Sequence, residues 1–324
     1  MTGGTGTFGK SFVRLTLEKF NPKKIIIFSR DEMKQWDMQN EYKNNHKVRF
    51  FLGDVRDKSR LLRALNGVDF VIHAAALKIV TTAEYNPFEY VNTNINGAIN
   101  IIDACIDKGV KKVVALSTDK ASSPINLYGA SKLVSDKLFI SGNSYSVSSG
   151  TKFSVVRYGN VMGSRGSIIP YFMSLANDKV FPITDKRMTR FMISLEEAID
   201  LVWHAFSDMK GGETYVKKIP SIKVTDIAKA INSDSKHKII GIKPGEKLHE
   251  QMIGIDDALY TYEYKTYYKI LSPINDWSND LKRIGKGKKV KLDFIYSSDK
   301  NDHWMSVSEL KNWIKLNKNR LGKI

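Results

Sequence analysis

Short apolar runs alternate with helical patterns through the first half of the chain. The runs are rich in Val, Ile and Phe, and they span residues 25–28, 48–52, 70–72, 113–116 and 153–156. Near-continuous apolar runs of this length are typical of parallel strands that are covered on both faces. Helical patterns separate them at 59–65, 87–107 and 127–141. This alternation predicts an α/β fold with a doubly wound, Rossmann-like parallel sheet.

The alternation becomes irregular after about residue 160, where Gly and Pro interrupt the chain more often. A helix is still predicted at 194–209, because Ser194 and Glu197 have the spacing of a capping box ahead of an apolar pattern. We expect this helix and a strand at 214–216 to return to the first sheet. The sequence therefore predicts two domains: a first domain of residues 1–161 joined by 192–219, and a smaller α/β domain of residues 162–191 and 220–324.

The composition favours a globular protein of a reducing compartment. The 324 residues are 42% hydrophobic, which is ample for a sizeable core, and the single cysteine, Cys105, has no partner for an internal disulfide. No apolar run approaches the ~20 residues that cross a bilayer. The net charge of +17 is spread along the chain without a nucleic-acid-binding motif. We therefore expect a cytoplasmic protein with no membrane segment, no nucleic-acid partner, and a surface that attracts small anions.

A glycine-rich loop at residues 2–9 matches the dinucleotide fingerprint. Its glycines stand where a turn must tighten and where backbone must approach a pyrophosphate. The next strand ends at Ser29 and Arg30, about twenty residues later. An acidic residue there would bind a ribose hydroxyl, whereas Ser29 and Arg30 suit a 2′-phosphate, so the sequence predicts NADP rather than NAD. The loop residues expected to contact this cofactor are Gly3, Thr5, Gly6, Thr7, Phe8 and Gly9.

Only Met1 precedes this loop, although the fingerprint normally follows a strand. About five apolar residues, ~16 Å of extended chain, would stand there. We therefore expect a sheet that is truncated at its first strand. The hypothesis that follows is a chain that folds poorly or binds its cofactor weakly, which a thermal melt and an NADP titration would test.

Asp119 and Lys120 follow a predicted strand, and Tyr128 and Lys132 come shortly after them. The last two share one helical face, so the ammonium can lower the pKa of the phenol while both point at one ligand, an arrangement that suits hydride chemistry. Asp119 and Lys120 add a proton donor and a proton acceptor that redox chemistry alone does not need. A lysine with a pKa near 10.4 must lose about three pH units to be mostly neutral at pH 7. Burial and Lys132 push the pKa of Lys120 down, whereas Asp119 pushes it up. The candidate catalytic residues are Thr118, Asp119, Lys120, Tyr128 and Lys132.

Several motifs follow one another in a familiar order: GDVRD at 53–57, HAAALK at 73–78, STDKA at 117–121, VRYGNV at 156–161, RMTRF at 187–191 and PGEKLHE at 244–250. With them the chain resembles the extended short-chain dehydrogenase/reductases. It is most similar to the inverting UDP-N-acetylglucosamine 4,6-dehydratases, which begin pseudaminic acid synthesis. The later motifs are specific to these lyases and their close relatives, whereas the glycine loop and the Tyr-x-x-x-Lys pair are shared by the whole superfamily.

The resemblance implies a role for each candidate catalytic residue. Tyr128 takes the proton of the sugar's 4-hydroxyl while NADP takes a hydride from C4. Lys120 removes the C5 proton, and Asp119 protonates the departing 6-hydroxyl. The hydride then returns to C6, and C5 is reprotonated with inversion. The resemblance also implies a homo-oligomer, a hexamer.

Binding residues are likewise implied by the resemblance. Lys243 departs from the family, which usually has arginine there, and lysine loses the bidentate fork that suits a diphosphate. The further cofactor contacts implied are Ser29, Arg30, Asp54, Val55, Ala74, Ala75, Ala76, Tyr128, Lys132 and Val161. The substrate contacts implied are Lys78, Asn160, Arg165, Gly166, Ser167, Arg190, Lys243 and Glu246.

Other functions remain open on sequence grounds. A retaining 4,6-dehydratase, a nucleotide-sugar epimerase and a simple reductase of the same fold would all use Tyr128 and Lys132, and a catalytically inactive, truncated form is a further alternative. The histidines have no metal-ligand spacing, so no metal is expected. His73 is predicted to have a structural hydrogen-bonding role.

Overall fold

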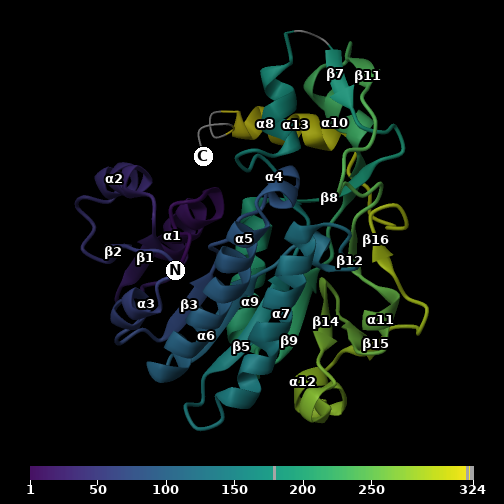
Figure 1. Cartoon of the computed structure of the whole chain (residues 1–324). Coiled ribbons are helices and arrows are strands. Elements are labelled where there is room, and N and C mark those ends of the chain that lie inside the picture. Colours follow the sequence, from purple (N-terminus) through teal and green to yellow (C-terminus); the bar gives the residue numbers. More distant parts are fainter. Residues whose placement is uncertain (178–179, 319–320, 322–324) are drawn as a thin grey trace.

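The computed structural model describes residues 1–177, 180–318 and 321, and its largest element is a sheet with the strand order β15-β13-β14-β9-β5-β4-β3 (Figure 1). The strands from β3 to β9 pair in parallel, as the apolar runs predicted, and β14, β13 and β15 continue the sheet with antiparallel pairs. The bounds are β3 (Phe70–His73), β4 (Lys112–Leu116), β5 (Lys152–Arg157), β9 (Glu213–Lys217), β13 (Thr261–Glu263), β14 (Tyr267–Leu271) and β15 (Lys288–Lys289).

The first two predicted strands, β1 (Ile25–Ser29) and β2 (Val48–Leu52), form a parallel pair of their own. Met1 and Thr2 lie between this pair and β3. Thr2 makes parallel bridges to Phe28 on one side and to His73 on the other. The amide of Thr2 donates to the carbonyl of Ile72 at 3.0 Å, and Phe28 donates to the carbonyl of Met1 at 2.8 Å. These short bridges connect the two parts of the sheet directly at the start of the glycine loop.

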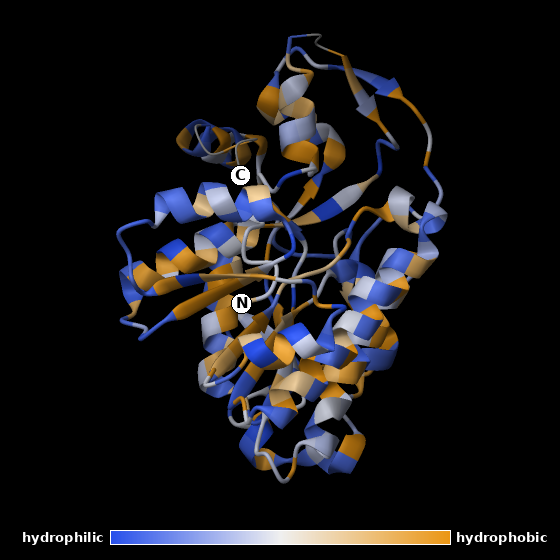
Figure 2. Cartoon of the chain, turned by 60° about the vertical axis from the view of Figure 1, so that its left-hand side comes forward, coloured by the Kyte–Doolittle hydropathy of each residue, from blue (hydrophilic) through white to orange (hydrophobic). Residues whose placement is uncertain are grey.

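Helices cover both faces of the sheet. On one face, α1 (Thr7–Lys19) packs against α9 (Leu195–Asp208), which lies on β4, β5 and β9. The other face carries α3 (Lys58–Ala64), α6 (Gly97–Asp107) and α7 (Leu127–Tyr145), whose buried Ile101 and Phe139 meet Val113 and Phe153 of the strands. The central strands are mostly hydrophobic, and the helices around them alternate in hydropathy (Figure 2). This two-sided burial is the arrangement that the near-continuous apolar runs predicted.

A second group of elements lies beyond the carboxyl ends of the parallel strands, at the top of Figure 1. It has its own apolar cluster, with Phe172, Phe181, Met192 and Ile227 at its centre. Its helices are α8 (Ile168–Ser174), α10 (Val224–Ile231) and α13 (Val307–Asn317), and its strands are β6 (Asn160–Val161), β7 (Val180–Ile183), β8 (Thr189–Ile193), β10 (Ser221–Lys223) and β11 (Lys236–Ile239). An adjoining antiparallel pair is β12 (Gln251–Ile253) and β16 (Tyr296–Ser297).

The chain returns to the large sheet twice after residue 160. Residues 192–219 supply α9 and β9, as expected, and the predicted capping box of Ser194 and Glu197 is present. Strands β13 to β15 also extend the large sheet, although the sequence assigned them to the smaller domain. The predicted division into a cofactor domain and a substrate domain stays a prediction.

The remaining helices are short. They are α2 (Glu32–Glu41), α4 (Val80–Tyr85), α5 (Pro87–Tyr90), η1 (Val91–Asn96), η2 (Asp119–Ala121), α11 (Ile255–Ala258), η3 (Ile274–Asn279) and α12 (Leu281–Ile284). Among the helices of the described ranges, none has both the length and the apolar character needed to traverse a lipid bilayer.

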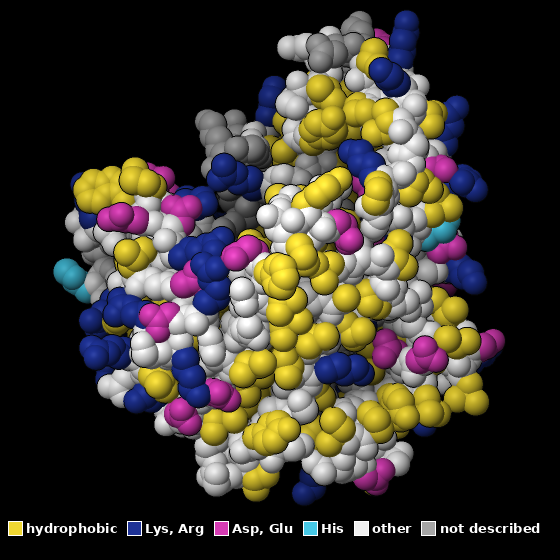
Figure 3. Space-filling model, viewed as in Figure 1, with side chains coloured by type: hydrophobic (Ala, Val, Ile, Leu, Met, Phe, Trp, Pro, Cys, Tyr) yellow, Lys and Arg dark blue, Asp and Glu magenta, His cyan; other side chains and the backbone are white. Residues whose placement is uncertain are grey.

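Apolar side chains gather on the face formed by α5, α6 and α7 (Figure 3). The exposed ones on these helices include Phe88, Ile99, Val134 and Tyr145. An apolar face of this kind on a folded chain indicates an interaction surface.

Candidate active site

The glycine loop turns tightly at the junction of β1 and β3. Gly3 has a positive φ of 64°, and a Cβ there would lie 2.8 Å from the amide nitrogen of Ala75. A Cβ at Gly9 would lie 2.2 Å from the carbonyl oxygen of Gly4, so only glycine lets α1 start this close to the loop. Helix α1 begins after Gly6 without a side-chain cap, which leaves its first N–H groups directed at the loop. This backbone arrangement fits a pyrophosphate.

The polar groups at the ends of β1 and β2 lie together beside the loop. The hydroxyl of Ser29 is 2.8 Å from that of Thr5, and Arg30 lies 3.7 Å from a carboxylate oxygen of Asp54. Asp54 also accepts a hydrogen bond from Arg56 at 2.8 Å. The guanidinium of Arg30 is about half exposed, with a side-chain exposure of 53%. It is therefore accessible to a ligand that lies over the loop.

His73 anchors the end of β3. The hydroxyl of Thr2 lies 2.9 Å from Nδ1 of His73 and accepts from the amides of Ala74 and Ala75 at 3.2 and 3.3 Å. Burial and the charge of Lys132 lower the pKa of His73 to about 3, so the ring is neutral. The structural hydrogen-bonding role predicted for His73 is confirmed, and Ala74 and Ala75 are held against the glycine loop.

Asp119, Lys120 and Glu250 form a buried ion cluster at the carboxyl end of β4. The ammonium of Lys120 lies 3.0 Å from an oxygen of Asp119 and 3.0 Å from an oxygen of Glu250. The side chains of Asp119 and Glu250 are 1% and 2% exposed. Sequence reasoning placed Asp119 and Lys120 together but assigned no role to Glu250, which stands 130 residues later in the PGEKLHE motif.

The electrostatics of this cluster correct the expectation for Lys120. Burial lowers its pKa, but the carboxylates of Asp119 and Glu250 outweigh burial, and the net pKa lies above the ordinary lysine value. Burial raises the pKa of Asp119, while Lys120 opposes that change. Although burial alone would raise the pKa of Glu250, Lys120 and Arg190 hold it below its usual range. The cluster therefore holds a protonated Lys120 beside an ionised Glu250.

Tyr128 and Thr118 adjoin the cluster. Thr118 donates to Asp119 at 3.0 Å, and its hydroxyl acts on the phenol of Tyr128. Burial raises the pKa of Tyr128 to about 12, while Thr118 and Lys120 act in the opposite direction. The expectation that Lys132 lowers the pKa of the phenol stays a prediction.

Lys132 and Asp136 lie one turn apart beneath Tyr128, and both are buried. Burial lowers the pKa of Lys132, and Asp136 partly restores it. Asp136 accepts from Ser117 at 2.6 Å and pairs with Arg157 at 3.4 Å. Sequence reasoning missed Asp136, although its position four residues after Lys132 on the same helix was a usable signal.

The start of α7 packs tightly on the turn that carries Lys120. A Cβ at Gly129 would lie 2.2 Å from the carbonyl oxygen of Lys120, whereas a Cβ at Gly142 in the same helix would meet only side chains, those of Ile102 at 3.2 Å and Phe153 at 3.4 Å. We expect Gly129→Ala to lower the free energy of unfolding by about 1–3 kcal/mol through overpacking. Gly142→Ala is the matched control, because both changes raise helix propensity equally. Equal urea midpoints for the two variants would contradict this prediction.

The predicted substrate residues fall into two groups around this cluster. Lys78 donates to the carbonyl of Arg165 at 3.2 Å, and burial lowers its pKa. The amide of Arg165 lies 3.4 Å from the hydroxyl of Thr7, so this segment touches the glycine loop. Gly166 has a positive φ of 75°, and Ser167 is the residue before α8. Asn160 and Val161 form β6, which leads from β5 into this segment.

The second group is the loop 243–247. Its Gly245 accepts from the side chain of Asn126 at 2.7 Å, and Lys243 and Glu246 bond one another through the loop backbone. Arg190 donates to the carbonyls of Thr189, Leu248 and Lys247, and it is 9% exposed. The structure therefore engages Arg190 with protein acceptors, and its predicted contact with a diphosphate stays a prediction.

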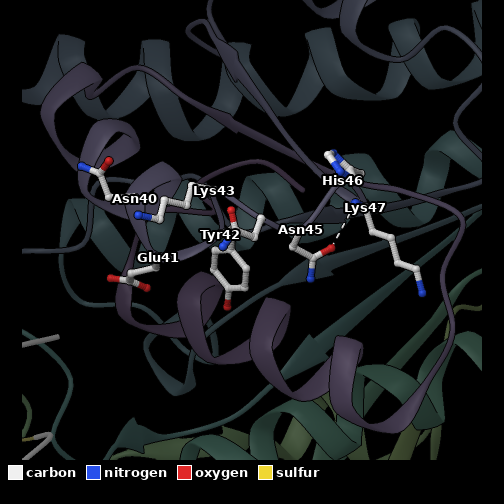
Figure 4. A pocket seen from close by; sticks show the side chains of 8 residues that line it. Asn40, Glu41, Tyr42, Lys43, Asn45, His46 and Lys47 are labelled. Carbon is white, nitrogen blue, oxygen red and sulfur yellow. Dashed lines mark hydrogen bonds between the residues drawn. The ribbon is translucent and has the colours of Figure 1, made fainter.

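A surface hollow of about 470 Å³ lies elsewhere, along residues 40–47 at the end of α2 (Figure 4). Its lining includes Tyr42, Asn45 and His46, and none of the predicted site residues. Within the described part of the chain, no three His, Cys, Asp or Glu side chains converge in a way that would hold a metal ion.

Comparison with known proteins points to one family. A family model described as polysaccharide biosynthesis protein matches residues 1–272. A relative from Campylobacter jejuni subsp. jejuni serotype O:2, named UDP-N-acetylglucosamine 4,6-dehydratase (inverting), is 55% identical and covers 96% of this chain and 95% of its own length. A relative from Rickettsia conorii, named UDP-glucose 4-epimerase, is 41% identical over 96% of this chain and 93% of its own length.

Solved structures agree with this fold. The X-ray structure of Pen from Bacillus thuringiensis has a TM-score of 0.89 at 40% identity, covering 98% of this chain and 96% of that one. A dTDP-glucose 4,6-dehydratase from Streptomyces venezuelae, solved with NAD bound, has a TM-score of 0.70 at 19% identity, covering 99% and 98%, and this likeness concerns the fold alone. Because the family model and the relatives span most of its length, the chain belongs to the polysaccharide biosynthesis protein family of the extended short-chain dehydrogenase/reductases, together with the inverting UDP-N-acetylglucosamine 4,6-dehydratases.

Proposed function

We propose that the protein converts UDP-N-acetylglucosamine to a UDP-4-keto-6-deoxy-hexosamine with inversion at C5. The observation that carries this proposal is the buried Asp119–Lys120 pair beside Tyr128. An epimerase or a simple reductase needs only Tyr128 and Lys132, whereas an elimination also needs an acid and a base at adjacent carbons. The 55% identity to the inverting dehydratase of Campylobacter jejuni supports the same substrate.

The glycine loop fits a nicotinamide dinucleotide, and we propose NADP. Gly3, Gly6 and Gly9 leave room for a pyrophosphate at the uncapped start of α1. Thr5 belongs to the same turn, and the amides of Ala74 and Ala75 bond Thr2 at its start. When bound, this group would accept a hydride from C4 of the sugar and return it to C6. Ser29 and the half-exposed Arg30 support a 2′-phosphate contact, since no acidic residue stands at the end of β1.

Arg30 gives this preference a direct test. Arg30→Ala removes a charge-assisted contact, so we expect the NADP dissociation constant to rise about 10- to 100-fold while that of NAD changes about twofold or less. Arg14→Ala is the matched control, because Arg14 is an exposed arginine of α1 that pairs with Glu18. The measurement is fluorescence titration with both dinucleotides. An equal loss for NAD and NADP would show that Arg30 does not read the 2′-phosphate.

The proton steps follow from the positions of the side chains. Tyr128, once its phenol has lost its own proton, accepts the proton of the 4-hydroxyl, and the C4 ketone that results acidifies the proton on C5. Lys120 first passes its own proton to Asp119, whose carboxylate oxygen lies 3.0 Å from Nζ, and then removes the C5 proton. Asp119, whose pKa burial raises, gives its proton to the 6-hydroxyl, which leaves as water. Reprotonation of C5 on the opposite face inverts that centre.

We propose that the sugar and diphosphate lie between the two groups of predicted contacts. Lys78, Asn160 and residues 165–167 approach from the β3 and β6 ends, and Arg190, Lys243 and Glu246 approach from the loop before β12. Lysines and arginines on both sides suit a diphosphate.

A single NMR experiment tests the proposed function. Incubation of the protein with UDP-N-acetylglucosamine and NADP in heavy water should give a 4-keto-6-deoxy sugar that carries deuterium at C5, with coupling constants of the inverted configuration. Retained coupling constants would indicate a retaining dehydratase. The galacto isomer would indicate an epimerase, as the name of the Rickettsia relative suggests for that protein. An unchanged sugar would overturn the proposal.

We further propose a homo-oligomer in the cytoplasm whose product enters pseudaminic acid synthesis. The exposed apolar residues Phe88, Ile99, Val134 and Tyr145 on α5 to α7 support burial of this face between copies.

A further inference from the structure

We propose that Glu250 is a positioning residue for Lys120, which it holds from the opposite side of the site to Asp119. The effect of Glu250 on catalysis rests on the proposed dehydration, whereas the contact between Glu250 and Lys120 does not. Glu250 acts through the lysine, because the oxygen of its carboxylate that faces the site contacts the ammonium of Lys120 and the guanidinium of Arg190.

The ammonium of Lys120 is held by two distant parts of the chain. Asp119 belongs to η2, directly after β4, whereas Glu250 directly precedes β12 in the segment that follows the loop 243–247. Both oxygens lie 3.0 Å from Nζ. A lysine side chain has four rotatable bonds and three donors, so one carboxylate fixes its direction poorly. Two carboxylates on opposite elements fix the position of Nζ.

Glu250 is itself fixed on several sides. Its amide donates to the hydroxyl of Ser298 at 2.9 Å, and its carbonyl accepts from the amide of Ser298 at 2.8 Å. Arg190 lies 3.7 Å from the same carboxylate oxygen that binds Lys120. Lys247, three residues earlier, donates to the carbonyl of Ser122 at 2.8 Å, directly after η2. The segment is therefore tied to the turn that carries Lys120.

One oxygen of each carboxylate is buried and has no hydrogen-bond partner among the described residues: Oδ2 of Asp119 and Oε2 of Glu250. An unpaired buried carboxylate oxygen costs stability, and such groups are found where a protein uses them. For Asp119 the proposed proton transfer to the 6-hydroxyl supplies a use. For Glu250 the use that the geometry supplies is control of Lys120, whose Nζ lies 3.0 Å from its other carboxylate oxygen.

The groups that face Lys120 are Asp119 and Glu250, Arg190 and Lys247, and the phenol of Tyr128. The two carboxylates raise the pKa of Lys120, whereas Arg190 lowers it. Neutralising Glu250 removes one of the two anions and leaves every cation in place. The pKa of Lys120 must then fall, by roughly 1–3 pH units for an opposite charge at this distance.

Glu250→Gln is the test in the intact chain. Because a displaced base loses its alignment, we expect kcat for UDP-N-acetylglucosamine to fall about 10- to 100-fold while KM changes about threefold or less. The rising limb of the kcat–pH profile should move to lower pH, since the amine loses its proton more easily. Glu250→Asp keeps the charge and should restore the position of that limb together with part of kcat.

Asp208→Asn is the matched control. Asp208 is a half-buried carboxylate that binds Lys269 and Tyr215 at 2.7 Å each, outside the predicted site. Its loss should leave kcat and the pH profile unchanged. If Glu250→Gln raised KM at constant kcat, Glu250 would be a substrate contact and the positioning role would be wrong. If the substitution changed neither kcat nor the rising limb of the kcat–pH profile, the positioning role would be refuted.

A second measurement does not depend on catalysis. Lysines are dimethylated with ¹³C-formaldehyde and observed by NMR. The resonance that is missing in Lys120→Arg is assigned to Lys120, and its pH titration is compared between the wild type and Glu250→Gln. We expect a lower pKa for Lys120 in the variant. An unchanged pKa would overturn the inference whether or not the protein dehydrates the sugar, whereas a lowered pKa without turnover in the wild type would refute only the proposed function.

Discussion

Lys120→Arg is expected to lose water elimination, with kcat for UDP-N-acetylglucosamine falling about 10²- to 10⁴-fold, the range of a lost general base. Arginine keeps a cation between Asp119 and Glu250 and offers both carboxylates hydrogen bonds, but its guanidinium does not give up a proton at any working pH. The substitution therefore removes the base while it preserves the ion pairs.

The comparison with Lys120→Met separates chemistry from stability. Methionine leaves the carboxylates of Asp119 and Glu250 buried without their cation, which costs about 3–5 kcal/mol when one partner of a buried pair is removed. We expect a clear drop in melting temperature for Lys120→Met and a small one for Lys120→Arg. Both variants should lack activity. Because only Lys120→Arg keeps its stability, only in that variant can the loss of activity be attributed to the missing proton acceptor.

Exchange at C5 is the sharpest readout for Lys120. The ready-made 4-keto-6-deoxy product is incubated with each variant in heavy water, and the incorporation of deuterium at C5 is followed by NMR. Neither Lys120 variant should exchange this proton faster than buffer alone. Exchange at the wild-type rate in Lys120→Arg would show that another group removes the C5 proton.

The sheet and its helices were largely predictable because their signals are local. Each apolar run from Ile25 to Val156 became a strand in parallel order. The predicted helix at 87–107 was only partly right, since α5 and α6 are separated by the π-helix η1. Its buried Asn94 bonds both backbone groups of Leu77 and the hydroxyl of Ser131. Partners 17 and 37 residues away leave no periodic trace in the sequence.

The candidate site was predictable in composition but not in electrostatics. Asp119, Lys120 and Tyr128 are close in sequence, and the structure brings them together. Glu250 reaches Lys120 only through tertiary folding, so the balance of charge on the amine was not visible. The desolvation of a side chain likewise depends on residues that are distant in the sequence and pack around it only in the folded chain. It raises the pKa of Tyr128 to about 12 although a lysine follows on the same helical face.

Tyr128→Phe is expected to lose turnover, as the Lys120 variants do, but to differ from them in proton exchange at C5. Removal of the phenol oxygen leaves no acceptor for the proton of the 4-hydroxyl, so we expect turnover of UDP-N-acetylglucosamine to fall about 10²- to 10⁴-fold. The 4-keto product already carries the ketone that acidifies C5, and Lys120 is intact in this variant. Tyr128→Phe should therefore still exchange the C5 proton of the ready-made product in heavy water.

The fold should tolerate this change. Tyr128 loses its interaction with the hydroxyl of Thr118, worth at most about 0.5–1.5 kcal/mol, and its ring stays packed in the cluster with Ala83 and Tyr90. Tyr145→Phe at the exposed end of α7 is the matched control and should keep full activity. If Tyr128→Phe lost exchange and turnover together, the phenol would serve the C5 step as well. Tyr128 and Lys120 would then share one proton path, and the assignment of separate protons to C4 and C5 would be wrong.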